Sequence, residues 1–211
     1  PLLQSSAASD VYKRQALLAT INSGDEVIIP APFWVSYPDI VDFAGGKSVI
    51  LECDESTNFK LSAEKLSNAI NDKTKWFILN SPSNPTGSCY TENELKDIAD
   101  VLQENSHVNV MSDDIYEHLV YDNFAFKTIA QINPDLSNQI LTINGVSKAY
   151  AMTGWRIGYA AGNRDLIKAM GKLQSQSTSN PSSISQAAAV EALNGDPVSY
   201  THLRAHETSI D

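Results

Sequence analysis

The sequence predicts an α/β fold in which a mostly parallel sheet lies between two layers of helices, a three-layer αβα sandwich. Short apolar runs typical of buried strands alternate with segments of helical composition. Such alternation implies right-handed crossovers that place helices on both faces of a parallel sheet. Polar and aromatic residues also gather where the predicted strands end, and ligands bind at that edge of such sheets. No internal repeat or low-complexity linker interrupts the chain, so one domain is expected.

The predicted strands share a short length and many β-branched or aromatic residues. They are residues 26–30, 47–51, 75–80, 108–111, 139–144 and 156–160. The predicted helices are residues 15–21, 33–43, 62–70, 91–104, 165–173 and 182–193. Ser62 has the position of an N-cap, and Thr91 with Glu94 forms the pattern of a capping box. These helix starts are therefore the best-defined boundaries.

Composition excludes several functional classes. The 211 residues carry 15 Lys and Arg against 25 Asp and Glu, a formal net charge of −10 with no basic stripe, which disfavours nucleic-acid binding. No apolar run approaches the roughly 20 residues of a membrane span, and the first residues lack the order of a signal peptide. Cys53 and Cys89 have no CxxC pattern and fit reduced thiols. We therefore expect a cytoplasmic protein with no membrane partner.

The two ends of the chain look foreign to the pattern between them. Residues 1–14 and 198–211 resemble translated sequencing-adapter read-through, so the domain is expected to span residues 15–197. His202 and His206 have the i, i+4 spacing of two metal ligands on a helix. Because no third ligand is identifiable, we expect no metal site.

A lysine and an arginine mark the stretch 144–158. Lys148 follows a predicted strand in a turn of small residues, where a desolvated amine can attack a carbonyl, and Arg156 can clamp an anion. Trp34, Asn84, Asp113, Tyr116 and Lys148 all fall at strand ends. This set suits pyridoxal phosphate, which needs an amine for a Schiff base, a carboxylate to keep its pyridine nitrogen protonated, and an anion clamp for its phosphate.

Four ordered motifs carry a resemblance to a known family. They are PAPFWVSYP (30–38), NSPSNPTG (80–87), SDDIYEHLVY (112–121) and SKAYAMTGWRIGY (147–159). The chain resembles the class I/II aminotransferases, the pyridoxal-phosphate-dependent enzymes of the aspartate aminotransferase superfamily. The similarity is greatest to the bacterial-type aspartate branch, also through SQSTSNPSSISQ (175–186). It implies the fold of the large, cofactor-binding domain and a homodimeric enzyme.

The resemblance assigns roles residue by residue. Lys148 matches the lysine that forms the Schiff base and carries the proton, and Asp113 matches the partner of the pyridine nitrogen. Tyr116 and Asn84 match donors to the phenolic oxygen. Trp34 matches the aromatic ring that stacks on the pyridine. Arg156, together with Ser147, matches the groups that bind the phosphate.

Each of these residues also has a structural interpretation. A loop lysine is usually a solvated charge, Asp113 alone fits a helix cap, and Asp114 competes for its role until the Asp-x-x-Tyr spacing selects Asp113. By the same reasoning Trp34 fits a core residue, Arg156 a surface ion pair and Asn84 a turn residue. The following residues have no role that the sequence supports and are taken as structural or unassigned: Ser36, Tyr37, His118, Tyr121 and Tyr150.

The sequence departs from the family pattern at several places. Residues 11–14 stand where the family has a glycine-rich phosphate turn, and Gly145 replaces a serine found in some relatives. The arginine that binds the substrate α-carboxylate belongs to a small domain expected outside this chain. We therefore expect an incomplete large domain that binds the cofactor weakly at best and does not turn over, and whose dimerisation is in question.

The resemblance implies transfer of an amino group between an amino acid and a 2-oxo acid, with aspartate and 2-oxoglutarate as the expected pair. Two alternatives remain open. One is a lyase on the same fold, distinguished by release of ammonia or pyruvate. The other is the effector domain of a transcription regulator, which would need an upstream helix-turn-helix module.

Overall fold

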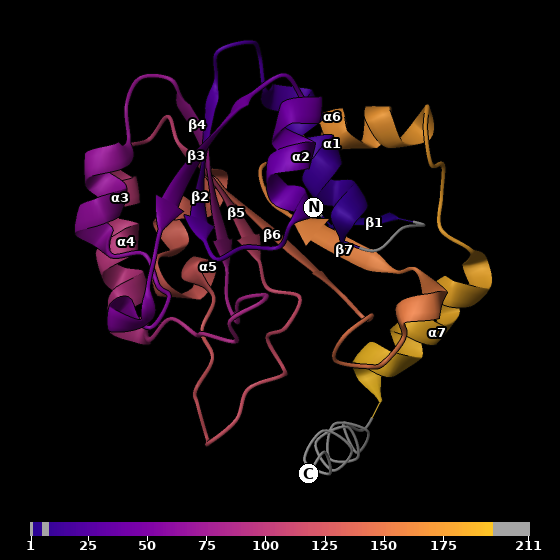
Figure 1. The fold of residues 1–211 in the computed structure, drawn as a ribbon. Helices are drawn as coiled ribbons and strands as arrows, with labels where there is room; N and C mark the ends of the chain where they lie inside the picture. The colour runs from indigo at the N-terminus through magenta and orange to yellow at the C-terminus, as the bar shows by residue number, and fades with distance from the viewer. Residues whose placement is uncertain (1, 6–8, 196–211) are drawn as a thin grey trace.

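The computed structural model describes residues 2–5 and 9–195 and contains one seven-stranded sheet. The sheet has the order β1-β7-β6-β5-β4-β2-β3 (Figure 1). Its strands are β1 (Leu2–Ser5), β2 (Glu26–Ala31), β3 (Lys47–Glu52), β4 (Thr74–Asn80), β5 (Asn109–Asp113), β6 (Ile140–Gly145) and β7 (Gly158–Ala161). The five strands β2 to β6 pair in parallel, whereas β7 runs antiparallel to both β6 and β1.

Helices cover both faces of the sheet (Figure 1). The helices are α1 (Asp10–Thr20), α2 (Ser36–Phe43), α3 (Ala63–Ala69), α4 (Glu92–Glu104), α5 (Ile129–Ile132), α6 (Arg164–Ser175) and α7 (Ser183–Asn194). Short 3-10 helices span Glu55–Thr57, Pro134–Asn138 and Thr153–Trp155. The predicted αβα sandwich is therefore confirmed.

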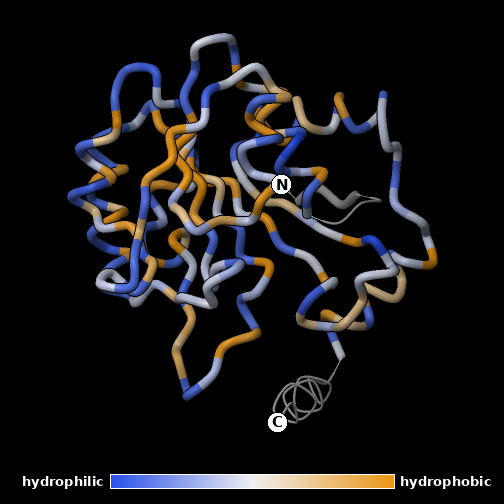
Figure 2. Tube along the Cα trace, viewed as in Figure 1, coloured by the Kyte–Doolittle hydropathy of each residue, from blue (hydrophilic) through white to orange (hydrophobic). Residues whose placement is uncertain are grey.

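Alternation along the strands separates two apolar cores. In β2, Val27 and Ile29 pack under α1, α2 and α6, whereas Ile28 packs under α3, α4 and α5. In β4 the same alternation sends Trp76 to the first core and Phe77 to the second. Figure 2 shows the result as a central band of hydrophobic strands flanked by helices in which hydrophilic and hydrophobic residues alternate. Burial on both faces explains why the strands are nearly continuous apolar runs.

The N-terminal boundary differs from the sequence prediction. The first helix begins at Asp10 rather than at residue 15, and β1 was not predicted. The strand β1 and the first five residues of α1, 10–14, lie within the segment 1–14 that we expected to stand outside the domain. The buried face of α1 includes Tyr12 and Lys13. Because lysine counts as a polar residue, the apolar periodicity of a helix was not recognised there. The origin of residues 1–14 and 198–211 stays a prediction; residues 198–211, with His202 and His206, lie outside the described residues.

The other boundaries agree within two residues, except that α2 begins at Ser36 rather than at residue 33, and α5 was not predicted. Thr91 and Glu94 form the predicted capping box, and Ser62 accepts a hydrogen bond from the Lys65 amide. The sixth predicted strand begins later than expected, at Gly158, because Arg156 has a left-handed backbone conformation (φ 56°). Among the described residues, no helix has the length and apolarity to cross a membrane, and no cluster of His, Cys, Asp and Glu has a metal-binding arrangement.

Candidate functional site

A cavity of about 170 Å³ opens at one edge of the sheet. It is lined by every site residue predicted from the sequence: Trp34, Asn84, Asp113, Tyr116, Ser147, Lys148 and Arg156. Ser9, Asp10, Lys13, Tyr37, Asn80, Ile115 and Thr153 complete its wall. Residues that are far apart in the sequence therefore meet in one place.

Strand direction explains this convergence. The strands β2, β4, β5 and β6 are parallel, so the segments after them emerge at the same edge and supply Trp34, Asn84, Asp113 and Lys148. Arg156 precedes its strand instead of following it. It reaches the same edge because β7 is antiparallel to β6, which brings the start of β7 beside the end of β6.

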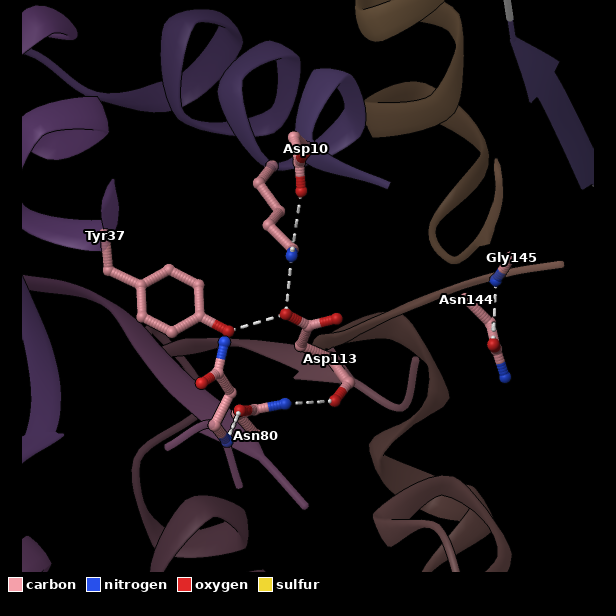
Figure 3. Close-up of polar contacts among 8 residues, drawn as sticks. Asp10, Tyr37, Asn80, Asp113, Asn144 and Gly145 are labelled. Carbon is pink, nitrogen blue, oxygen red and sulfur yellow. Dashed lines mark hydrogen bonds and ion pairs between the residues drawn. The ribbon is translucent and has the colours of Figure 1, made fainter. Parts of the chain in front are cut away.

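Asp113 is the most enclosed charged group of the cavity, with its side chain 2% exposed. Its Oδ2 accepts a hydrogen bond from the Tyr37 hydroxyl at 2.5 Å and lies 2.6 Å from Lys13 Nζ (Figure 3). Burial, followed by the negative charge of Asp113, raises the pKa of Tyr37 well above its usual value, so this phenol stays a hydrogen-bond donor. The carboxylate is thus held by one neutral and one cationic donor.

A second set of contacts holds the loops around Asp113. Asn80 donates from Nδ2 to the backbone oxygen of Asp113 at 2.8 Å, and its Oδ1 accepts from the Asn84 amide at 2.8 Å (Figure 3). One side chain therefore fixes the loop after β4 to the end of β5. Asn80 positions Asn84 relative to Asp113, although the sequence analysis gave Asn80 no task.

The loop between β6 and β7 brings the basic residues to the cavity. Lys148 Nζ lies 5.6 Å from the centroid of the Tyr116 ring, which faces the amine with its π-system. Arg156 donates from Nη1 to the backbone oxygen of Thr153 at 3.1 Å, which orients the guanidinium. The neighbouring Ser147 is 5% exposed.

Asp113 and Asp114 have different surroundings. Asp113 lines the cavity, whereas Asp114 is buried behind it and accepts a hydrogen bond from the Ser112 hydroxyl at 2.8 Å. Desolvation raises the pKa of Asp114 to about 8. A carboxyl that is neutral near physiological pH and does not line the cavity is poorly placed to hold a cationic ligand.

Two buried polar atoms test whether the cavity fits pyridoxal phosphate. Within the described residues, Asp113 Oδ1 and Ser147 Oγ have no hydrogen-bond partner. The first is an acceptor suited to a protonated ring nitrogen, and the second is a hydroxyl suited to a phosphate oxygen near Arg156. The strand-end residues therefore fit the group.

The helix α1 contributes a feature that the sequence analysis did not anticipate. Lys13 has a side chain only 4% exposed, and its Nζ lies 4.7 Å from the centroid of the Trp34 ring as well as beside Asp113. Tyr37 was also left without a role, yet its hydroxyl contacts Asp113. The one available sequence signal was the position of Tyr37 three residues after Trp34, on the first turn of α2.

The structure also accounts for Gly145. A Cβ at this position would lie 2.8 Å from the Ile157 backbone oxygen and 3.1 Å from the Gly158 Cα. The strands β6 and β7 approach too closely here for any side chain to fit without a backbone shift. The absence of a serine hydroxyl at residue 145 is therefore tied to the close pairing of these strands.

Comparison with known proteins identifies the same family that the sequence motifs resemble. The family model for aminotransferases of class I and II matches residues 4–210. A probable aspartate/prephenate aminotransferase of Rickettsia conorii is 65% identical over 178 residues, which are 84% of this chain and 44% of that protein. An aspartate/prephenate aminotransferase of Cereibacter sphaeroides is 63% identical over 180 residues, 85% of this chain and 45% of that protein.

A solved structure is similar as well. The crystal structure of the aspartate aminotransferase from Rhizobium meliloti matches with a TM-score of 0.93 and 52% sequence identity, covering 95% of this chain and 50% of that one. The chain thus spans about half the length of the relatives that it matches. The chain belongs to the class I and II aminotransferase family.

Proposed function

We propose that this chain forms the cofactor-binding domain of a pyridoxal-phosphate-dependent aminotransferase that moves an amino group between aspartate and a 2-oxo acid. One observation carries the proposal: the seven residues selected from the sequence line a single cavity, although they follow or precede different strands. Family membership supports transamination over the lyase and regulator alternatives, since the similar proteins are named as aminotransferases.

Lys148 is the proposed reactive amine. It lines the cavity, is exposed to solvent and lies over the Tyr116 ring, so its amine is accessible to a bound aldehyde. When bound, pyridoxal phosphate supplies a protonated ring that withdraws electrons from that carbon. The amine of Lys148 would accept the proton from the substrate α-carbon and would then donate it to the carbon that carried the cofactor aldehyde.

Asp113 is the proposed partner of the ring nitrogen. A buried carboxylate beside this nitrogen keeps the proton on it, because the opposite charge stabilises the protonated form. The hydroxyl of Tyr37 holds the carboxylate in one orientation by its hydrogen bond to Oδ2. The unpartnered Oδ1 is left as the acceptor for the ring N–H.

The other cavity residues would orient the group. Tyr116 and Asn84 are the proposed donors to the phenolic oxygen, and Arg156 with Ser147 would bind the phosphate through charge-assisted hydrogen bonds. Trp34 would stack on the pyridine face. Together these residues would hold the ring between the ends of β2 and β5 and the loop that follows β6.

The substrate assignment rests on the relatives. Their names support aspartate as the amino donor. They also suggest prephenate, which is a 2-oxo acid, as an acceptor besides the predicted 2-oxoglutarate. Homodimerisation and a cytoplasmic location stay predictions from the family resemblance and the composition. Because the chain spans about half of these relatives, turnover is proposed for the enzyme to which this domain belongs.

Borohydride trapping tests the proposal directly. The purified chain is mixed with pyridoxal phosphate, reduced, digested and mapped by mass spectrometry. The pyridoxyl group is expected on Lys148, and Lys148→Ala should remove it while the control Lys168→Ala, on the exposed side of α6, should not. Labelling spread over exposed lysines with no preference for Lys148 would contradict the proposal. Exchange of the aspartate α-proton with deuterium, followed by NMR, then measures whether the domain performs the proton step.

A further inference from the structure

The contacts of Lys13 are unusual for a lysine. Its side chain is 4% exposed, its Nζ lies 2.6 Å from Asp113 Oδ2, and the same nitrogen lies 4.7 Å from the Trp34 ring centroid and 5.6 Å from that of Tyr37. Burial of a lysine side chain is costly unless its nitrogen is paired, and Asp113 is the partner here. The ammonium therefore occupies the part of the cavity bounded by Asp113 and Trp34.

We propose that in this chain, whatever the origin of residues 1–14, Lys13 is an internal competitor for pyridoxal phosphate: its ammonium pairs with the Asp113 carboxylate and covers the aromatic face that the cofactor ring would use, so cofactor binding requires Lys13 to move away. This inference rests on the proposed function, because it assigns the ring nitrogen to Asp113 and the ring face to Trp34.

The first part of the argument is charge. A carboxylate that already pairs with a fixed ammonium attracts a second cation less strongly, because the two positive charges repel each other in a poorly solvated site. The Asp113 carboxylate is 2% exposed, so water screens this repulsion little. Protonation of a bound ring nitrogen is thus disfavoured while Lys13 stays in place.

The second part is space. A stacked ring requires the face of Trp34, and Lys13 Nζ lies over that face within cation–π distance. The aliphatic stem of Lys13 comes from α1 and lies in the same cavity wall. Ring and ammonium cannot share this face, so one of them must leave.

The structure also offers Lys13 an alternative position. Asp10, one turn earlier on α1, has its Oδ1 3.5 Å from Lys13 Nζ and a side chain that is 48% exposed. Rotation of the lysine side chain toward Asp10 would keep an ion pair while moving the ammonium toward water. The displaced state is therefore reachable without unfolding α1.

The test uses the full chain and two ligands: pyridoxal phosphate, and pyridoxine 5′-phosphate, which keeps the ring nitrogen and phosphate but has no aldehyde. Lys13→Met removes the charge but keeps most of the side-chain volume, whereas Lys13→Ala also opens the space. Lys168→Met is the matched control, since Lys168 forms a similar i, i+3 pair with Asp165 but is 64% exposed on α6. Dissociation constants are measured by calorimetry.

We expect both Lys13 variants to bind pyridoxine 5′-phosphate at least about tenfold more tightly than the wild type, or about 1.4 kcal/mol. Lys13→Ala should gain more than Lys13→Met if space contributes beyond charge, and Lys168→Met should bind as the wild type does. In an Asp113→Asn background, the gain from Lys13→Met should disappear because the carboxylate that links the two cations is gone.

Acetylation of the wild type gives a second measurement that needs no substitution. Lys13 should be protected from acetic anhydride in the free protein and become reactive when pyridoxine 5′-phosphate is added, while Lys148 shows the opposite change. Equal affinities of the wild type and both Lys13 variants, with trapping still on Lys148, would overturn the inference and leave the proposed function intact. Absence of cofactor binding in the wild type and in both Lys13 variants would overturn both.

Discussion

Removal of the Tyr37 hydroxyl gives a quantitative test of the Asp113 environment. In Tyr37→Phe the ring stays in the first apolar core, and only the 2.5 Å hydrogen bond to Asp113 Oδ2 is lost. A hydrogen bond to a charged group contributes about 1.5–3 kcal/mol, and burial of both partners places this one in the upper half of that range. We therefore expect the free energy of unfolding to fall by about 2–3 kcal/mol.

The pH dependence gives the same experiment a second readout. The pKa of Tyr37 is raised in the folded protein, so the folded state holds the phenol proton more tightly than the unfolded state does. The associated stability is fully present below the unfolded pKa of about 10 and is lost as pH rises toward the folded pKa. Wild-type stability should therefore fall faster above about pH 10 than that of Tyr37→Phe.

Urea denaturation followed by circular dichroism measures both effects, and Tyr90→Phe is the matched control. Tyr90 is also buried, but its hydroxyl accepts from the neutral Leu61 amide at 2.8 Å. Tyr37→Phe should couple with Asp113→Asn in a double-mutant cycle, whereas Tyr90→Phe should be additive with it. A Tyr37→Phe cost below about 0.5 kcal/mol, or the same cost with and without the Asp113 carboxylate, would refute the reasoning.

Three further outcomes follow from the structure. Gly145→Ala places a methyl group 2.8 Å from the Ile157 backbone oxygen and should lower the free energy of unfolding by about 1–3 kcal/mol in urea titrations, whereas Gly154→Ala, with open space around it, should not. Asp114 has a folded pKa of about 8, so its contribution to stability is present below the unfolded pKa of about 4 and is lost as pH rises toward 8. In Asp114→Asn, the free energy of unfolding should therefore change less with pH between about 4 and 8 than it does in the wild type. Thr91→Ala removes one half of the capping box and should cost about 1 kcal/mol by thermal or urea denaturation, and an unchanged midpoint would contradict the importance of this cap.

Local sequence patterns were sufficient for most of the fold. The capping box at Thr91, for example, depends on residues within one helical turn and was predicted correctly. The strands β2, β4, β5 and β6 are buried on both faces, so each one appears in the sequence as an apolar run. The edge strand β1 gives no such signal because it is defined by backbone pairing with β7.

The residues that the family motifs selected for the site lie together in the structure. The Asp-x-x-Tyr spacing selected Asp113 over Asp114, and both Asp113 and Tyr116 line the cavity. The contact of Tyr37 was not predictable in this way, because its partner is 76 positions away in the sequence. Lys13 was missed for a different reason: its burial depends on an ion pair with Asp113 that no local pattern contains.

The antiparallel strand β7 has a consequence for the order in which the cavity can form. Lys148 and Arg156 lie in the single loop between β6 and β7, so they approach each other once these two neighbouring strands pair. The Asp113 side of the cavity depends on closing the much longer loop to Tyr37, which is entropically more costly and slower. A ligand that contacts both Lys148 and Asp113 would therefore connect the early-forming β6–β7 hairpin to contacts that form late. Its binding free energy would add to the free energy of unfolding of the whole sheet.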